Sequence, residues 1–217
     1  MNKFKYSDAE REAIYRVIYE RRDMRHFMPD TVEPLVLKRI LNAAHKAPSV
    51  GLMQPWRFIR ITNQGLREKL HACVKTESAK TAEALGERKE EFMRLKVEGM
   101  LECGELLVVV LPPGREKHIF GRRTLPEMDL ASAACAIQNM WLAARAEGLG
   151  MGWVSLFEPD ELSNILSLPE GSHPIAILCL GHVDKFYEQP MLVMENWAEE
   201  RPLEDMLFEN SWGDEVL

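Results

Sequence analysis

The 217-residue sequence lacks the short motifs that identify many metal, nucleotide and acyl-transfer sites. It contains no HExxH pair, no CxxC pair, no Walker GxxxxGKS/T loop and no GxSxG turn. The glycine cluster GLGMG, residues 148–152, follows a predicted helix and precedes a predicted strand, which is the reverse of the order in a Rossmann turn. These absences argue against a zinc enzyme, a P-loop nucleotide-binding protein, a GxSxG hydrolase and a Rossmann dinucleotide-binding protein.

Cysteine, basic charge and long apolar runs are also scarce. Cys73, Cys103, Cys135 and Cys179 stand far apart in mostly apolar surroundings, which favours buried free thiols and a reducing cytoplasm over disulfides or a metal site. The net charge of −7 gives no general attraction to nucleic acid or to an anionic membrane. The N-terminus has no signal-peptide core, and the run LLVVVLPP is too short to span a bilayer. We therefore expect a soluble cytoplasmic protein without a metal.

What the sequence does contain is enough apolar residues, 46%, for a packed core, with no internal repeat and no low-complexity linker. Periodicity predicts helices over residues 7–23, 34–47, 126–148 and 159–166, and strands over 56–61, 105–111, 150–157 and 173–183. Residues 75–105 are dense in charge and predict one or two exposed helices, for which a solvated surface is the favoured interpretation and a cover over a site the alternative. The alternation of helices and strands predicts one α/β or α+β domain.

Three segments carry particular expectations. The first helix opens with a capping box, Ser7 with Glu10, and has an apolar face that includes Val17. The helix over 126–148 should be largely buried through a face made by Leu130, Ala134, Ile137, Trp141 and Ala144. The tail over 185–217 contains apolar residues, including two tryptophans, and predicts an arm that docks on something, such as a second subunit.

Two polar segments are candidates for a binding site. In RRDMR, residues 21–25, the arginine forks can reach one phosphate, although for this segment taken alone a solvated helix end with Asp23 paired to an arginine is the favoured interpretation. In PSVGLMQPW, residues 48–56, backbone N–H groups and a flat apolar wall suit a heteroaromatic ring, and the alternative is an ordinary turn before a strand.

Taken in order, RRDMRHF, APSVGLMQPWRF, AEGLGMGWVSLF and RPLED resemble the nitroreductase family of FMN enzymes, over roughly Tyr6 to Trp212. The resemblance implies one domain over residues 1–217 of α+β (mixed α/β) class, with a central mixed sheet and a buried helix. It further implies a homodimer with a domain-swapped C-terminal arm over 185–217. Residues 75–105 would form a lid insertion, in which Lys96 is a basic residue of interest.

One departure narrows the resemblance, because the common family pattern has serine where this sequence has Asp23. With this residue, the chain resembles the flavin-destroying branch of the family, the dimethylbenzimidazole synthases. Three further segments carry the same resemblance: AAHKAPSVGLMQPW, MDLASAACAIQNMWLAARAEGLGMGWVS and PLEDMLFE. The branch implies oxygen-dependent fragmentation of reduced FMN to 5,6-dimethylbenzimidazole, the lower ligand of cobalamin, with release of erythrose 4-phosphate. FMN is then the substrate, dioxygen the co-substrate, and an NAD(P)H-dependent flavin reductase the expected source of reduced FMN.

The resemblance also implies roles for particular residues. Asp23 and Ser155 would be catalytic; because the neighbouring arginines favour its ionised form, Asp23 is expected to act as a base. Gly51 would offer its backbone N–H near the flavin and dioxygen. The residues expected to contact the flavin are Arg21, Arg22, Asp23, Met24, Arg25, Ser49, Gly51, Gln54, Ser155 and Arg201.

Two other functions remain open at this point. An ordinary NAD(P)H-dependent nitroreductase or flavin oxidoreductase, which keeps its FMN, shares nearly all these motifs, so that Asp23, Ser155 and the lid are what distinguish it. A non-catalytic flavin-binding protein would need the arginines but would gain nothing from Asp23.

Overall fold

The computed structural model describes residues 3–213 and is built around a four-stranded sheet. The strands are β1 (Arg57–Arg60), β2 (Glu105–Leu111), β3 (Gly150–Val154) and β4 (His173–Gly181), in the order β1-β2-β4-β3. The α-helices are α1 (Asp8–Glu20), α2 (Pro34–His45), α3 (Gln64–Ala84), α4 (Lys89–Arg94), α5 (Met128–Ala146), α6 (Pro159–Ile165) and α7 (Met191–Met194). The predicted α+β class is confirmed.

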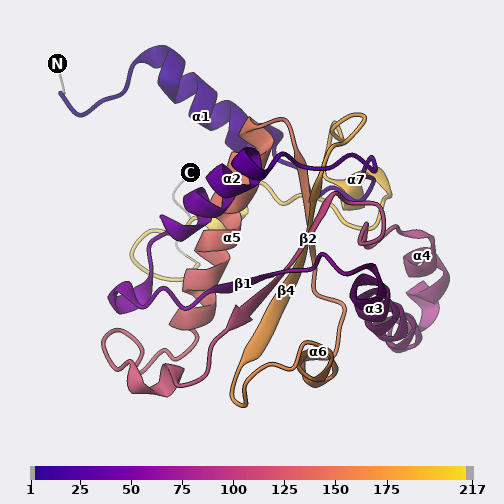
Figure 1. Cartoon of the computed structure of the whole chain (residues 1–217). Helices are drawn as coiled ribbons and strands as arrows, with labels where there is room; N and C mark the ends of the chain where they lie inside the picture. The colour runs from indigo at the N-terminus through magenta and orange to yellow at the C-terminus, as the bar shows by residue number, and fades with distance from the viewer. Residues whose placement is uncertain (1–2, 214–217) are drawn as a thin grey trace.

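Helices cover both faces of the sheet, with α2 and α5 on one side and α3 and α6 on the other (Figure 1). The alternation of side chains along the fully buried strand β2 explains the two cores. Leu107 and Val109 pack into the core shared with α2 and α5, whereas Leu106 and Val108 pack into the core shared with α3 and α6. The predicted buried central strand is therefore confirmed, and it separates two apolar layers.

The sheet differs from the expectation in its strand directions. All four strands pair antiparallel, whereas a mixed sheet was expected. The parallel contact found in the described residues is an isolated bridge between Asp23 and Met151 of β3, where the Met24 N–H donates to the Met151 carbonyl oxygen over 3.0 Å. The segment after α1 thus lies along the free edge of β3 without forming a strand.

Helix α5 is confirmed, but its buried face is rotated from the predicted one. Ile137, Trp141 and Ala144 are buried as expected, whereas Leu130 is exposed and Ala134 is only half-buried. Small residues explain the change, because Ala133 and Ala136 allow the close approach of α2 and the sheet. The opposite side of α5 is left open and includes Cys135, the exposed exception among the four free cysteines.

Helix α1 has the predicted capping box but no buried residue. The Ser7 Oγ accepts from the Glu10 N–H, and Glu10 Oε2 accepts from the Ser7 N–H over 2.9 Å. The helix projects from the upper left of the molecule in Figure 1. Its exposed apolar and aromatic side chains are Ile14, Tyr15, Ile18 and Tyr19. The face predicted from periodicity is therefore largely exposed, although Val17 is half-buried and Ile18 and Tyr19 line a cavity shared with the arm.

The charged segment is helical, as predicted, but its first helix begins earlier than expected. Asn63 caps α3 by accepting the Leu66 N–H over 2.8 Å, so that α3 starts eleven residues before Lys75. The apolar side of α3, with Leu70 and Val74, packs under the sheet, as does Met100 at the far end of the segment. Within residues 75–105, α4 and its connecting segments therefore lie outside the core. Their role as a lid stays a prediction.

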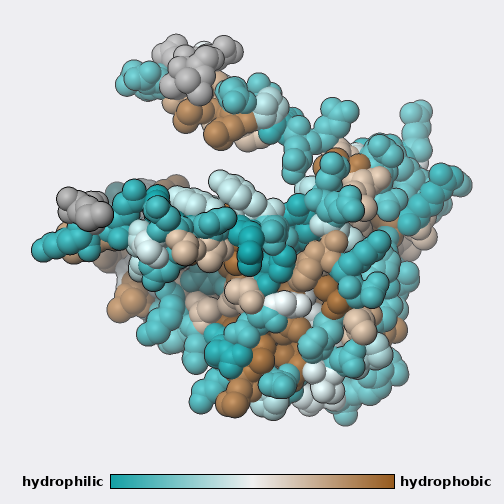
Figure 2. Space-filling model, turned by 90° about the horizontal axis from the view of Figure 1, so that it is seen from above, coloured by the Kyte–Doolittle hydropathy of each residue, from teal (hydrophilic) through white to brown (hydrophobic). Residues whose placement is uncertain are grey.

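The C-terminal arm first packs on its own chain and then leaves it. Arg88 lies over the ring of Trp197 at 3.6 Å and donates to the Trp197 carbonyl oxygen over 2.9 Å. Beyond this contact, Leu203, Met206 and Trp212 are exposed. Figure 2 shows the last part of the chain standing clear of the body and carrying hydrophobic side chains. Within residues 3–213, no helix has the length and apolar character to cross a bilayer.

Candidate active site

Asp23, Arg25 and the end of β3 form one polar centre. The Asp23 Oδ2 accepts from Arg25 Nη2 over 2.5 Å, and Asp23 Oδ1 accepts from the Trp153 N–H over 3.1 Å. The same Arg25 Nη2 donates to the Trp153 carbonyl oxygen over 2.9 Å. Because both polar groups of the Trp153 backbone are used, the bridge between the 21–25 segment and β3 fixes the carboxylate and the guanidinium together.

Burial raises the pKa of the Asp23 carboxyl above its ordinary value. The charges of Arg25 and Arg21 and the Trp153 N–H lower that pKa, but they do not outweigh the loss of solvation. The expectation that the arginines alone would decide the ionisation of Asp23 is therefore corrected. A carboxyl with a raised pKa can hold a proton as well as accept one, which suits a group that takes part in several proton transfers.

Ser155 follows the last residue of β3 and opens onto a small cavity beside this centre. The cavity has a volume of about 190 Å³ and is mostly apolar. Its wall combines Arg25 and residues 153–156 with α4, the residues that follow it and the arm; these last contribute Phe92, Leu95, Val97, Met191, Leu192 and Trp197. The structure thus brings Asp23, Arg25 and Ser155 to one place, and the segment expected to be a lid lines the same cavity.

Arg25 has donors to spare at this centre. Its side chain is only 10% exposed, and its Nε and Nη1 atoms have no hydrogen-bond partner in the part of the chain that the structure describes. A buried guanidinium with unused donors is costly unless a ligand or a rearrangement satisfies it. The residues present therefore fit an anionic or acceptor-rich ligand.

Arg21 and Arg22 face a different cavity, of about 470 Å³, on the other side of the segment. Arg22 donates to the carbonyl oxygens of Tyr19 and Glu188, so its fork is used to attach the arm. Arg21 stacks over Trp141 at 4.6 Å and has no ion-pair partner among residues 3–213. Of the two arginines that line this cavity, Arg21 is the one whose side chain is not used in a hydrogen bond among residues 3–213, and Arg25 does not line this cavity.

Two of the predicted flavin contacts are placed differently from the expectation. Met24 is completely buried, and its N–H is already bonded to β3, so in this structure it offers no surface to a ligand; its side chain is part of the packing. Arg201 is exposed on the arm and lies outside both cavities. Its proposed approach to the flavin remains a prediction that depends on where the arm docks.

The loop after α2 forms a second group of candidate residues. Gly51, Leu52 and Gln54 all have positive φ, between 47° and 52°, so the chain makes an unusually tight path here. The Ser49 Oγ accepts the Gln54 N–H over 3.0 Å and so closes the loop. In the described chain this loop is contacted by Arg57 of β1, Ser132 of α5 and Phe120 of the 112–127 loop. None of the hydrogen bonds found among residues 3–213 joins it to Asp23 or Ser155. The family resemblance implies that this loop contributes to the flavin site of a partner subunit, which stays a prediction.

Sequence reasoning missed several residues that shape the site. Trp153 supplies the backbone contacts to Asp23, and Trp141 donates its Nε1–H to the Arg22 carbonyl oxygen over 3.1 Å. The Tyr187 hydroxyl accepts from the Arg25 N–H over 3.2 Å and lies 2.7 Å from His26 Nδ1. An aromatic residue near a charged segment was the available signal, but a hydrogen bond between residues 130 apart leaves no trace in the sequence.

The comparisons with known proteins agree with this architecture. A model of the nitroreductase family matches residues 18–182. The chain is 36% identical over 200 residues to the 5,6-dimethylbenzimidazole synthase of Rhodospirillum rubrum, covering 91% of this chain and 94% of that protein. It is 34% identical over 201 residues to the enzyme of the same name from Rhodobacter capsulatus, covering 92% of this chain and 97% of that protein.

Solved structures extend the agreement to the fold. A BluB-like flavoprotein from Clostridium difficile 630 superposes with a TM-score of 0.71 over 91% of this chain and 99% of that chain. The two sequences are 19% identical, so this likeness concerns the fold alone. The overall fold is therefore shared with a flavoprotein.

Proposed function

The chain belongs to the nitroreductase family, and from this membership we propose that it is an oxidoreductase that forms 5,6-dimethylbenzimidazole, the lower ligand of cobalamin, from reduced FMN and dioxygen. The other product is erythrose 4-phosphate. The relatives that match it over more than nine tenths of its length carry the name of this synthase. FMN is thus a substrate that is consumed, whereas in an ordinary nitroreductase it would be retained.

The observation that carries the proposal is the environment of Asp23. The carboxyl is fixed by Arg25 and by the Trp153 N–H, its pKa is raised by burial, and it lies beside the cavity that Ser155 lines. A protein that only bound flavin would have no use for a positioned carboxyl with this pKa. Proton transfers during C–C cleavage require such a group.

In this proposal Arg21 binds the substrate, and Asp23 and Ser155 act at the flavin ring. Arg21 binds the phosphate of FMN by charge-assisted hydrogen bonds, and its place over Trp141 holds the fork in position. Asp23 takes up and returns protons at its open carboxylate edge. The hydroxyl of Ser155 donates to or accepts from the edge of the flavin ring. Reduced FMN supplies the electrons for the reaction with dioxygen.

The second group of residues requires a homodimer. Ser49, Gly51 and Gln54 lie on a loop that does not reach Asp23 within the described chain, so we place them against the Asp23 centre of the partner subunit. The exposed apolar residues of α1 and of the arm are consistent with such an interface. A separate NAD(P)H-dependent flavin reductase supplies the reduced FMN, and α4 with its connections closes over the cavity as a lid.

The test is one turnover with chemically reduced FMN. The purified protein is mixed with reduced FMN without air, air is admitted, and the flavin absorbance and the products are followed by chromatography and mass. We expect loss of flavin and appearance of the dimethylbenzimidazole mass. Complete return of oxidised FMN would reject the synthase, and NADH or NADPH turnover would then separate a nitroreductase from a binding protein.

A further inference from the structure

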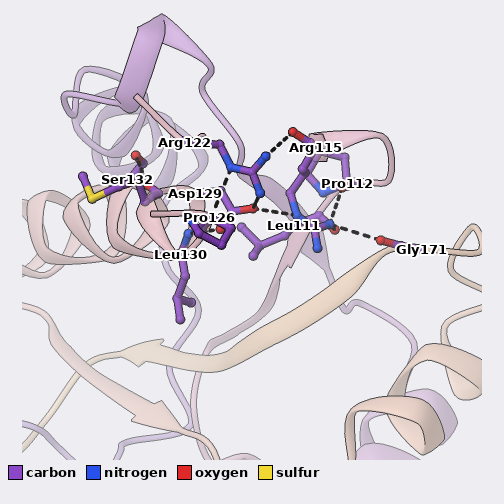
Figure 3. A network of polar contacts seen from close by, with 10 residues as sticks. Leu111, Pro112, Arg115, Arg122, Pro126, Asp129, Leu130, Ser132 and Gly171 are labelled. Atoms are coloured by element: carbon purple, nitrogen blue, oxygen red, sulfur yellow. Dashed lines mark hydrogen bonds and ion pairs between the residues drawn. The ribbon is translucent and has the colours of Figure 1, made fainter. Parts of the chain in front are cut away.

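A buried ion-pair network at the start of α5 lies away from the Asp23 centre. Asp129 Oδ2 accepts from Arg115 Nε and from Arg122 Nη2, each over 2.9 Å (Figure 3). Its Oδ1 accepts the Leu130 N–H over 2.6 Å. The side chains of Asp129 and Arg122 are less than a tenth exposed. The carboxylate is thus fully used and shielded from solvent, which excludes it as a free acid or base and points to a structural or positioning role.

The two arginines use their remaining donors to fasten the 112–127 loop. Arg115 Nη1 donates to the carbonyl oxygens of Leu111, Pro112 and Gly171, of which the bond to Gly171 spans 3.1 Å. Arg122 donates to the carbonyl oxygens of Arg115 and Pro126. Apart from the three-residue 3₁₀ turn Arg115–Lys117, this loop has no regular structure. The network therefore adds side-chain anchors to the local backbone hydrogen bonds of the loop, such as the one from the Arg122 N–H to the Ile119 carbonyl oxygen over 3.0 Å.

The loop that is fastened in this way packs directly on Gly51. A Cβ atom placed on Gly51 would lie 3.2 Å from Phe120 Cδ1 and 3.2 Å from the Phe120 carbonyl oxygen. A Cβ placed on Gly121 would lie only 2.5 Å from Val50 Cγ2. No side chain fits between the two turns. The Gly51 turn and the Phe120 turn are thus in backbone-to-backbone contact, and a shift of one moves the other.

A second anchor from the same helix holds the Gly51 turn from the other side. The Val50 N–H donates to Ser132 Oγ over 3.0 Å, and Ser132 lies one turn after Asp129 on α5. Asp129 holds the 112–127 loop and Ser132 holds residue 50, so the first turn of α5 sets the position of both partners in the contact.

The backbone N–H of Gly51 differs from its neighbours in this turn, because it lacks a hydrogen-bond acceptor among the described residues. In the same turn, the N–H groups of Leu52 and Met53 donate to the carbonyl oxygens of Ser49 and Val50, and that of Gln54 donates to Ser49 Oγ. For the Gly51 N–H, no acceptor is found within residues 3–213. A glycine at φ +51°, pressed on Phe120, therefore presents one free amide in a fixed direction.

We infer that Phe120, held in place by the network of Asp129 with Arg115 and Arg122, is a positioning residue that fixes the direction of the Gly51 amide. The catalytic part of this inference rests on the proposed function. An N–H that points at the reacting flavin and dioxygen favours formation of the benzimidazole over simple reoxidation of the flavin. Without that donor, reduced FMN and dioxygen end as oxidised FMN and hydrogen peroxide. Phe120 acts through Gly51 and does not itself carry out chemistry.

Phe120→Ala is a clean variant for the test, because the side chain is 84% exposed and its loss leaves no core cavity. Leu125→Ala is the matched control: Leu125 is an exposed apolar residue of the same loop, and the atoms nearest to a Cβ placed on Gly51 all belong to Phe120. Phe120→Tyr keeps the ring and should behave as the wild type. Asp129→Asn tests the network itself, since it removes the charge that holds both arginines.

The first readout needs no flavin. Hydrogen exchange, followed by mass spectrometry, should be faster in Phe120→Ala for peptides that contain the Leu52 and Met53 amides, and unchanged in Leu125→Ala. The second readout is the partition of reduced FMN in air. The fraction that ends as dimethylbenzimidazole should fall about tenfold in Phe120→Ala, with hydrogen peroxide rising in step, a smaller effect than the roughly 10²-fold loss that follows removal of a donor itself.

The outcomes separate the inference from the function on which it rests. Unchanged exchange at residues 49–54 in Phe120→Ala would overturn the inference, whatever the activity. Faster exchange with an unchanged partition would overturn its catalytic part. If the wild type makes no benzimidazole, the proposed function fails, and the exchange comparison still decides whether Phe120 fixes the Gly51 turn. A response of Leu125→Ala equal to that of Phe120→Ala would also reject a specific role for Phe120.

Discussion

Asp23 and Arg25 form an ion pair that is buried on one side and open on the other. Asp23 Oδ2 lies 2.5 Å from Arg25 Nη2; the arginine side chain is 10% exposed, whereas the carboxylate side chain is 40% exposed. The Trp153 backbone holds both partners from beneath. Because the arginine is locked by its other bonds, the carboxylate keeps its position while one edge stays free for a ligand.

Replacement of this carboxylate should separate binding from chemistry. In Asp23→Asn the amide can still accept from the Trp153 N–H, so the site should keep its shape and bind FMN within about threefold of the wild type, a difference of under about 1 kcal/mol. Product formation should fall by about 10²-fold or more, because a proton-transferring group has been lost. Flavin fluorescence titration and product mass give the two numbers. A parallel loss of both would mean that Asp23 is structural.

The raised pKa of Asp23 predicts how this variant changes stability with pH. A folded-state pKa above the unfolded value means that the native state binds more protons, so the wild type loses stability as the pH rises from the ordinary Asp range of about 4 through the folded pKa. Asp23→Asn has no such titration. Its free energy of unfolding relative to the wild type should therefore increase with pH over this window, as measured by urea denaturation.

The control for the pH prediction is Asp184→Asn, in which an exposed aspartate is replaced. This variant reports the effect of removing one negative charge from a chain of net charge −7. The same pH trend in both variants would assign the effect to net charge, and no trend in Asp23→Asn would show that Asp23 does not titrate abnormally.

If Arg21 binds the phosphate, replacing it should weaken the affinity for FMN more than the affinity for riboflavin. Arg21→Ala should weaken FMN by about 10- to 100-fold, the worth of a charge-assisted hydrogen bond of roughly 1.5–3 kcal/mol, and should change riboflavin, which has no phosphate, by less than about threefold. Lys38→Ala, on the exposed face of α2, removes the same charge elsewhere. Equal weakening of FMN and riboflavin would count against the phosphate contact.

The local features of the fold could be predicted because their signals lie within a few residues. The capping box of Ser7 and Glu10, the continuous apolar run of β2 and the small residues of α5 each specify an element by themselves. The start of α3 was missed because its signal is a single cap, Asn63, before a weakly periodic and charged stretch. The face of α1 could be predicted, but what covers it could not, since this face is largely exposed in the described chain.

The site shows a similar division. The neighbourhood of Asp23 and Arg25 could be predicted because they are two residues apart. That Arg21 and Arg25 face different cavities could not, because this depends on where α1 ends and where the chain meets β3: Arg21 is the C-cap residue of α1, whereas Arg25 follows the contact of Met24 with β3. The pKa direction of Asp23 likewise depends on burial by distant elements, which no local pattern encodes.

The contact of Arg88 with Trp197 predicts how the segment proposed as a lid is held in place. Arg88→Ala removes both the stacking and the hydrogen bond to the arm, so hydrogen exchange over residues 86–97 should become faster, while the Leu70 and Val74 part of α3 stays protected by its packing under the sheet. Reoxidation of bound reduced FMN without product should increase as the cavity opens to water. Glu87→Ala, on the same turn, is the control. Equal exchange rates in both variants would show that Arg88 does not hold this segment against the arm.

The bare apolar side of α1 predicts the assembly state. Four exposed apolar or aromatic residues on one short helix, together with the arm that stands clear of the body, should be covered by a second copy, so native mass spectrometry should find twice the chain mass of 24.9 kDa. Ile14→Glu places a charge in that interface and should shift the protein toward the monomer with loss of product formation, whereas Arg16→Glu, on an exposed position without an apolar neighbour to lose, should leave the dimer intact. Because Gly51 and Asp23 would meet only across the interface, activity should follow the dimer fraction on dilution. A monomer with full activity would disprove both the dimer and the shared site.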